Sequence, residues 1–153
     1  MRASALPWRP PAVFLTASAV VFGLDQSTKA LAVIHLSSRG PVPLPGDVVR
    51  LSLVHNVGSA FGLVQVAWPL ILVGGLCCVV IPALVLLRRN LPQSQAVLLA
   101  GIWGGSLGNL LDRLRTGGVT DFIDLRVWPV FNVADIAITL GCLGLAVHLV
   151  ARR

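Results

Sequence analysis

The sequence predicts an all-α polytopic membrane protein with four transmembrane helices and a small extracytoplasmic β-sheet between helices 1 and 2. Of its 153 residues, 56% are apolar and only 12% are charged, whereas a soluble domain carries roughly 25% charged residues. Four apolar segments are long enough to be considered as membrane helices. We therefore expect a single membrane-embedded domain over residues 1–153.

The four expected helices cover residues 11–36, 68–87, 95–113 and 131–151. Crossing a hydrocarbon core of roughly 30 Å takes about 20 helical residues. The first two segments meet this length outright. The other two meet it only if Arg113 and Asn132 are drawn into their outer ends.

The sheet is expected in the connection that follows the first helix. A proline-rich stretch, residues 41–46, precedes a run of β-prone residues from Val48 to Val54. Short β-branched runs bounded by Gly and Pro are typical of strands. We read this segment as a small sheet outside the membrane.

The arginines indicate the orientation. They lie before the first segment and after the second and fourth, at Arg2, Arg9, Arg88, Arg89, Arg152 and Arg153. In a four-span arrangement all of them fall on one side, which the positive-inside rule makes cytoplasmic, together with both termini. Because the net charge of +6 is distributed in this way, we do not expect a nucleic-acid partner.

The polar residues within the apolar segments gather toward the opposite, outer side. At about 1.5 Å per residue from position 11, Asp25 lies roughly 21 Å and Lys29 roughly 27 Å along the first helix. The third and fourth helices carry their polar residues at their outer ends, at Asn109, Arg113, Asn132 and Asp135. Ionisable groups at membrane depth are expensive to keep, so this convergence is a functional-site hypothesis.

Spacing along the helices suggests structural roles for several of these residues. Asp25 and Lys29 are spaced i, i+4 and can neutralise each other as an ion pair that fixes helix packing. The third helix carries two overlapping small-xxx-small frames, which predict close helix packing. Such packing would bring Asn109 and Arg113 near the neighbouring helices. The glycines of the frames are Gly101, Gly104, Gly105 and Gly108.

Two aspartates at such a site suggest acid–base chemistry. Carboxylates held close together share a proton, so that one acts as general base on a water while the other polarises a carbonyl. Asp135 is one candidate, and its partner could be Asp121, Asp124 or Asp112. Ser59 lacks a suitably placed base, and there is no HExxH or clustered His/Cys set, so we expect no catalytic metal and no cofactor.

Other functions are compatible with the same residues. The acids could serve merely to balance the charge of nearby arginines, and the protein could then be a structural or assembly subunit that catalyses no reaction. Alternatively, Asp25, Lys29 and Asp135 could relay protons in a small proton-coupled membrane transporter. A transporter predicts polar residues through the whole membrane depth, whereas here the inner halves of the helices are apolar.

Five blocks, taken in order, resemble a known family. They are DQSTK at 25–29, NVGSAF at 56–61, GNLLDR at 108–113, VTDF at 119–122 and FNVAD at 131–135. Together they resemble the lipoprotein signal peptidases (signal peptidase II), which are bacterial four-span aspartyl endopeptidases. These enzymes remove the signal peptide of prolipoproteins by cleaving before a cysteine that already carries a diacylglyceryl group.

The resemblance implies roles for individual residues. Asp121 and Asp135 correspond to the catalytic pair, and Asp124 gains no role. Asn56, Asn109, Arg113 and Asn132 correspond to substrate-binding residues, and Asp25 and Lys29 to the structural polar pair. It also implies a monomer in the bacterial cytoplasmic (inner) membrane, with an active site near the outer face. The implied partners are the lipid bilayer and diacylglyceryl-modified prolipoproteins, and no cofactor is implied.

Overall fold

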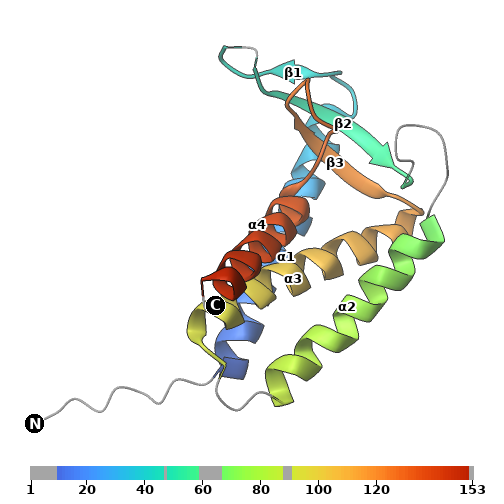
Figure 1. Cartoon of the computed structure of the whole chain (residues 1–153). Coiled ribbons are helices and arrows are strands. Elements are labelled where there is room, and N and C mark those ends of the chain that lie inside the picture. Colours follow the sequence, from blue (N-terminus) through green and yellow to red (C-terminus); the bar gives the residue numbers. More distant parts are fainter. Residues whose placement is uncertain (1–9, 47, 59–66, 88–90, 152–153) are drawn as a thin grey trace, which may run out of the picture.

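Four helices occur where the sequence has its four apolar segments. The computed structural model describes residues 10–46, 48–58, 67–87 and 91–151. The helices are α1 (Pro10–Leu36), α2 (Ala67–Leu87), α3 (Gln93–Thr116) and α4 (Val133–Val150). α3 packs against each of the other three. The start of α1 and the end of α4 lie at the end of the bundle away from the sheet (Figure 1).

The helices differ in how readily each could cross a membrane. Within the described ranges, α4 is the one helix that is long and apolar enough by itself, and Leu72–Leu87 within α2 is a shorter apolar stretch. α1 and α3 carry charged residues, but Asp25, Lys29 and Asp112 are buried inside the bundle. The arginines that predict the orientation lie outside the described residues. Four membrane spans therefore stay a prediction.

The sheet has three antiparallel strands in the order β1–β2–β3. β1 (Val42–Pro43) and β2 (Arg50–Asn56) follow α1 as expected, but β3 (Val119–Asp124) lies between α3 and α4. The expectation that the whole sheet lies between the first two helices is thus wrong. The left-handed Gly117 (φ 77°) ends α3, as is usual at helix C-termini. The chain then pairs along the free edge of β2.

The register of β3 decides where Asp121 points. Val54 is the cross-strand partner of Asp121, after a shift of register between Leu51 and Val54. Asn56 lies two residues beyond Val54, so its side chain emerges on the same face of the sheet as Asp121. The irregularity thus brings an amide from β2 next to a carboxylate on β3.

The glycine frames of α3 let two helices approach its backbone, which confirms the packing prediction. A Cβ on Gly104 would lie 2.6 Å from the carbonyl oxygen of Ser18 in α1, and one on Gly108 would collide with the carboxylate of Asp25. On the other face, a Cβ on Gly105 would lie 2.7 Å from the carbonyl oxygen of Ala134 in α4. Small residues permit such backbone contact.

We expect Gly105→Ala to destabilise the bundle because the new methyl group would meet a backbone atom that only a shift of α4 can move. Overpacking of this kind costs about 1–3 kcal/mol. Thermal unfolding in detergent micelles measures the loss. The matched control is Gly75→Ala in α2, where a Cβ meets nothing within 4 Å. Equal stability of the two variants would contradict the packing described above.

Candidate functional site

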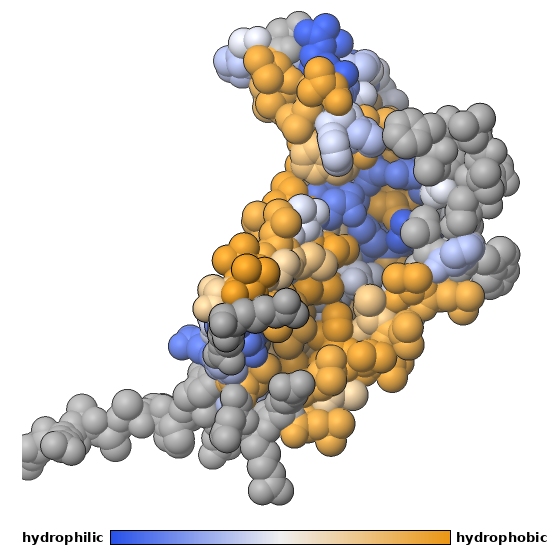
Figure 2. All heavy atoms as spheres, viewed as in Figure 1, coloured by the Kyte–Doolittle hydropathy of each residue, from blue (hydrophilic) through white to orange (hydrophobic). Residues whose placement is uncertain are grey.

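Polar residues gather in a hollow between the sheet and the adjoining ends of the helices. Figure 2 shows hydrophilic residues in this hollow and a largely hydrophobic surface over the helices below it. Six polar or charged side chains from α1, α3, β3 and the start of α4 are buried in this region: Asp25, Lys29, Asn109, Asp112, Asp121 and Asn132. Buried polar groups are stable only when they are hydrogen-bonded, so their partners define the site.

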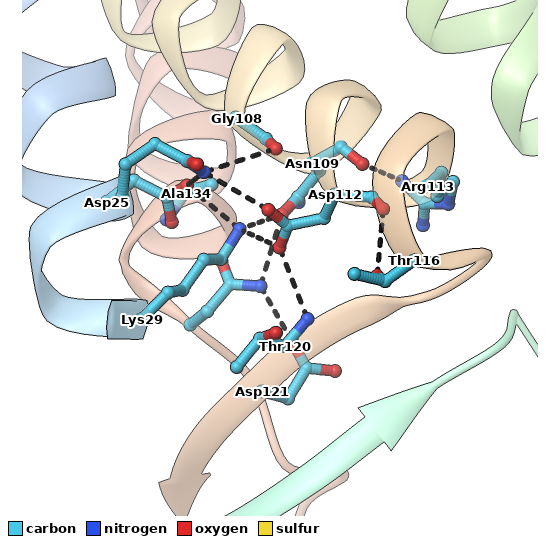
Figure 3. A network of polar contacts seen from close by, with 12 residues as sticks. Asp25, Lys29, Gly108, Asn109, Asp112, Arg113, Thr116, Thr120, Asp121 and Ala134 are labelled. Atoms are coloured by element: carbon cyan, nitrogen blue, oxygen red, sulfur yellow. Dashed lines mark hydrogen bonds and ion pairs between the residues drawn. The ribbon is translucent and has the colours of Figure 1, made fainter. Parts of the chain in front are cut away.

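Lys29 lies at the centre of this network (Figure 3). Its ammonium nitrogen is 2.8 Å from Oδ2 of Asp25 and 2.9 Å from Oδ2 of Asp112. The same nitrogen donates to Oδ1 of Asn109 at 2.8 Å. An ammonium group has three hydrogens, so these contacts satisfy it completely.

The two carboxylates that neutralise Lys29 also bind backbone groups of other elements. Oδ1 of Asp25 accepts a hydrogen bond from the backbone N–H of Ala134, in the first turn of α4. Oδ2 of Asp112 accepts one from the backbone N–H of Thr120 on β3. Charged groups make the stronger hydrogen bonds. The ion pairs of α1 and α3 therefore also fix the start of α4 and the position next to Asp121.

Two asparagine amides extend the network to the remaining acids. The side-chain nitrogen of Asn109 donates to Oδ1 of Asp135 at 2.8 Å. That of Asn132 donates to Oδ1 of Asn109 at 3.2 Å and to Oδ1 of Asp121 at 2.6 Å. Asp121 and Asp135 are thus joined to each other and to Lys29 through amides.

Asn132 binds both of these acids directly. It caps α4 in an extended conformation, so it precedes the helix, although the fourth predicted segment includes it. The side-chain oxygen of Asn132 accepts a hydrogen bond from the backbone N–H of Asp135 at 3.0 Å. The backbone N–H of Asn132 donates to Oδ2 of Asp135 at 3.3 Å. This reciprocal capping box holds Asp135, while the amide nitrogen of the same residue holds Asp121.

Asp121 is held in an environment that favours its protonated form. The pKa of Asp121 is raised to about 6, chiefly by burial and in smaller part by the charge of Asp135. Hydrogen bonds from Asn56 (2.9 Å to Oδ2) and Asn132, together with the charge of Lys29, act in the opposite direction. Desolvation disfavours the charged form of a carboxyl group, so Asp121 keeps its proton to a higher pH than an ordinary aspartate does.

The geometry distinguishes the three acids that the sequence leaves open as partners of Asp135. Asp112 has both oxygens engaged, since Oδ1 accepts from Gln26 at 3.2 Å and Oδ2 faces Lys29. Asp124 lies at the far end of β3 and accepts from the backbone N–H of Arg126. Asp121 alone among the three shares a hydrogen-bonding residue with Asp135.

Arg113 lies at the edge of the network. Its guanidinium donates to the carbonyl oxygen of Asn109 at 3.2 Å, one turn earlier in α3. It is half-buried and interacts electrostatically with Asp135 and Asp121. The shared helix face of Asn109 and Arg113 is thus observed, and the positive charge of the guanidinium interacts favourably with both carboxylates.

The sequence did not reveal the roles of Gln26, Asp112 and Thr120. Gln26 donates to both Asp25 and Asp112, linking the acids of two helices. The available signal was the i, i+4 spacing of Gly108 and Asp112, which places a carboxylate on the face of α3 that packs against α1. Thr120 contributes only its backbone N–H, which no sequence pattern predicts.

An apolar hollow leads away from Asp135 along the outside of α4. It has a volume of about 320 Å³ and is lined by Asp135 and six other residues: Leu125, Trp128, Phe131, Ile136, Thr139 and Leu140. A mostly apolar hollow with a few polar groups, here Asp135 and Thr139, is typical of ligand sites. Within the described residues, no three His, Cys, Asp or Glu side chains are grouped so that they could hold a metal ion.

Comparisons with known proteins give consistent results. The family model described as signal peptidase (SPase) II matches residues 17–151. The lipoprotein signal peptidase of Moorella thermoacetica is 40% identical over 131 residues, which are 84% of this chain and 86% of that protein. The one of Mycobacterium avium is 40% identical over 149 residues, covering 91% of this chain and 81% of its own length.

Solved structures share the fold. A bacterial membrane enzyme determined by the in meso method superposes with a TM-score of 0.81 at 22% sequence identity, covering 90% of this chain and 92% of its own. A second such structure gives a TM-score of 0.80, also at 22% identity, and covers 92% of this chain and 88% of its own.

We expect Lys29→Met to destabilise the fold strongly, because it leaves the carboxylates of Asp25 and Asp112 buried without their cation. Breaking a buried ion pair from one side costs about 3–5 kcal/mol. Thermal unfolding in micelles is the measurement. Arg115→Met, at an exposed arginine of α3, is the control and should change stability by no more than about 0.5 kcal/mol. Similar losses in the two variants would contradict the central role of Lys29.

Proposed function

The chain belongs to the signal peptidase II family, and from this premise we propose that it is an intramembrane aspartyl endopeptidase that removes the signal peptide from prolipoproteins. The bond cut would precede a cysteine that carries a diacylglyceryl group. One observation carries the catalytic assignment: Asp121 and Asp135 are both bound by Asn132, which is fully buried. Two carboxylates held by one residue are suited to act on one water.

The raised pKa of Asp121 suggests which of the two acids is protonated and which acts as the general base. Asp121 would hold the shared proton and polarise the carbonyl of the scissile bond, and Asp135 would take a proton from the attacking water. The resulting tetrahedral intermediate would collapse as the proton on Asp135 passes to the departing amine. This leaves the pair in its starting state, with the proton on Asp121 and Asp135 ionised, and the new carboxylic acid of the product releases its own proton to solvent. This route requires no cofactor.

The neighbouring polar residues would hold the acids and the substrate in place. Asn109 and Asn132 present their amide N–H groups to the acids, so each carboxylate keeps a fixed orientation as the substrate binds. Asn56 and Arg113 lie at the edge of the pair and are the residues we assign to the substrate backbone. Asp25 and Lys29 would hold this arrangement in place through their contacts with α3 and α4, without touching the substrate.

The membrane placement is part of the same proposal. We propose four spans, with the sheet and the acids near the outer face and both termini in the cytoplasm. The supporting observation is that the buried charges of α1 and α3 lie near the sheet, while α4 is apolar enough to cross a bilayer alone. The cytoplasmic (inner) membrane of a bacterium is the compartment in which lipid-modified precursors are available.

The transporter alternative is not supported, because the family matched is one of peptidases. The contacts of Lys29 argue in the same direction. Its three hydrogen-bond positions are filled by Asp25, Asp112 and Asn109, whereas a proton relay needs a group whose partners change during the cycle.

We expect Asp121→Asn and Asp135→Asn each to lower the cleavage rate by at least about a thousandfold, because each removes one of two interdependent proton-transfer groups. The measurement is cleavage of a diacylglyceryl-modified precursor by the purified enzyme in bilayers. Asp124→Asn is the control, since Asp124 contacts a turn outside the network. Near wild-type cleavage by either catalytic variant would refute the pair.

The pH dependence should follow the proton on Asp121. Because the pKa of Asp121 is about 6, the carboxyl group keeps this proton at a lower pH and loses it at a higher pH. We therefore expect kcat/KM to fall as the pH rises through about 6. Asn56→Leu removes a hydrogen bond that favours the ionised form. It should therefore move the midpoint upward, by up to about one pH unit. A downward movement, or none, would show that another group controls this limb.

A further inference from the structure

The connection between β3 and α4 presents apolar side chains to the surroundings. Val127 is 92% exposed and Trp128 is 67% exposed. The loop also carries Arg126 and Pro129, both of which are exposed. Large apolar side chains at a loop tip are unfavourable in water, and a contiguous group of them marks an interaction surface.

The backbone holds this loop in a defined shape. At its base the N–H of Phe131 donates to the carbonyl oxygen of Ile123 at 3.0 Å, and the N–H of Ile123 donates back at 2.8 Å. Within the loop, the N–H of Val127 donates to the carbonyl of Leu125 at 2.8 Å. Arg126 adopts a φ of 65°, which is uncommon and costly for residues other than glycine. The fold thus keeps the loop tip exposed although the backbone conformation of Arg126 is energetically unfavourable.

The tip lies beside α4. Trp128 lines the same hollow as Ile136, Thr139 and Leu140, which are one to two turns into the helix. Beyond this hollow the surface of α4 continues with exposed apolar side chains, at Leu143 and Val147. The loop is therefore continuous with the helix surface that would face lipid.

We propose that the β3–α4 loop inserts Val127 and Trp128 into the outer leaflet of the bilayer, at the boundary between headgroups and acyl chains. The inference rests on the membrane placement in the proposed function. Tryptophan is enriched at this boundary because its ring is apolar and its N–H is polar. An arginine next to the tip suits the phosphate layer just above it. The occupant of this surface is therefore phospholipid.

Insertion of this loop would have a direct consequence for the site. The loop joins β3, which carries Asp121, to Asn132, which binds both acids. A tip anchored in lipid would thus set the depth of the two carboxylates relative to the membrane surface. It would also leave the hollow between Trp128 and α4 open to the leaflet, on the side that ends at Asp135.

Quenching of tryptophan fluorescence by brominated phospholipids tests the insertion. The full chain is reconstituted in bilayers that carry bromine either near the headgroup end or near the end of the acyl chains. The chain has four tryptophans, so the emission lost in Trp128→Phe isolates the signal of Trp128. We expect this signal to be largely lost with bromine near the headgroups and to be less affected by deep bromine. Quenching by aqueous iodide instead of bromine would overturn the proposal.

Two further measurements distinguish insertion into lipid from contact with a second copy of the chain. Contact with a second copy of the chain would make the Trp128 emission depend on the number of proteins per bilayer disc and not on bromine, which would also overturn the proposal. The variant Val127→Ser, at a residue that does not line the hollow, should lower kcat/KM several-fold in bilayers and change it little in detergent. Val48→Ser, at an exposed valine of the β1–β2 connection, is the control. Because the quenching does not require cleavage, an inactive wild-type chain would refute the proposed function alone.

Discussion

The ion pairs of one buried lysine are the interaction on which the site depends. An ammonium group held away from water is costly unless its charge and all of its hydrogens are matched. Lys29 of α1 meets this requirement only when Asp25, Asp112 and Asn109 are in position. Two of these partners belong to α3, so the close packing at Gly104 and Gly108 and the burial of Lys29 require each other.

The directions of the hydrogen bonds follow from this lysine. Because an ammonium group can only donate, Asn109 must turn its oxygen toward Lys29 and its nitrogen toward Asp135. Asn132 in turn donates to the same oxygen of Asn109 and to Asp121, which leaves its own oxygen for the N–H of Asp135. Both acids are thereby met by N–H groups. A single cation on α1 fixes the orientation of two amides and two carboxylates on three other elements.

The sequence predicts those features that depend on local spacing. Helix positions follow from apolar length, and the packing of α3 follows from the four-residue spacing of its glycines. β3 was missed because its partner strand lies more than sixty residues earlier and because its acids resemble those of a polar loop. For the same reason the partner of Asp135 could not be chosen from spacing alone: the direction of Asp121 depends on a register shift in β2, which is a property of the assembled sheet.

The environment of Asp121 explains why the site lies between the helices and the sheet. The proposed hydrolysis would require water, which the hydrocarbon core lacks, whereas a carboxyl group with a raised pKa requires burial. The largest influence on the pKa of Asp121 is burial, ahead of the charge of Asp135. In the proposed mechanism, the position of β3 against the bundle would therefore be the main reason why Asp121 holds the shared proton. A sheet resting on the helix ends supplies this burial, and in the proposed mechanism water and the peptide bond would enter through the hollow beside it.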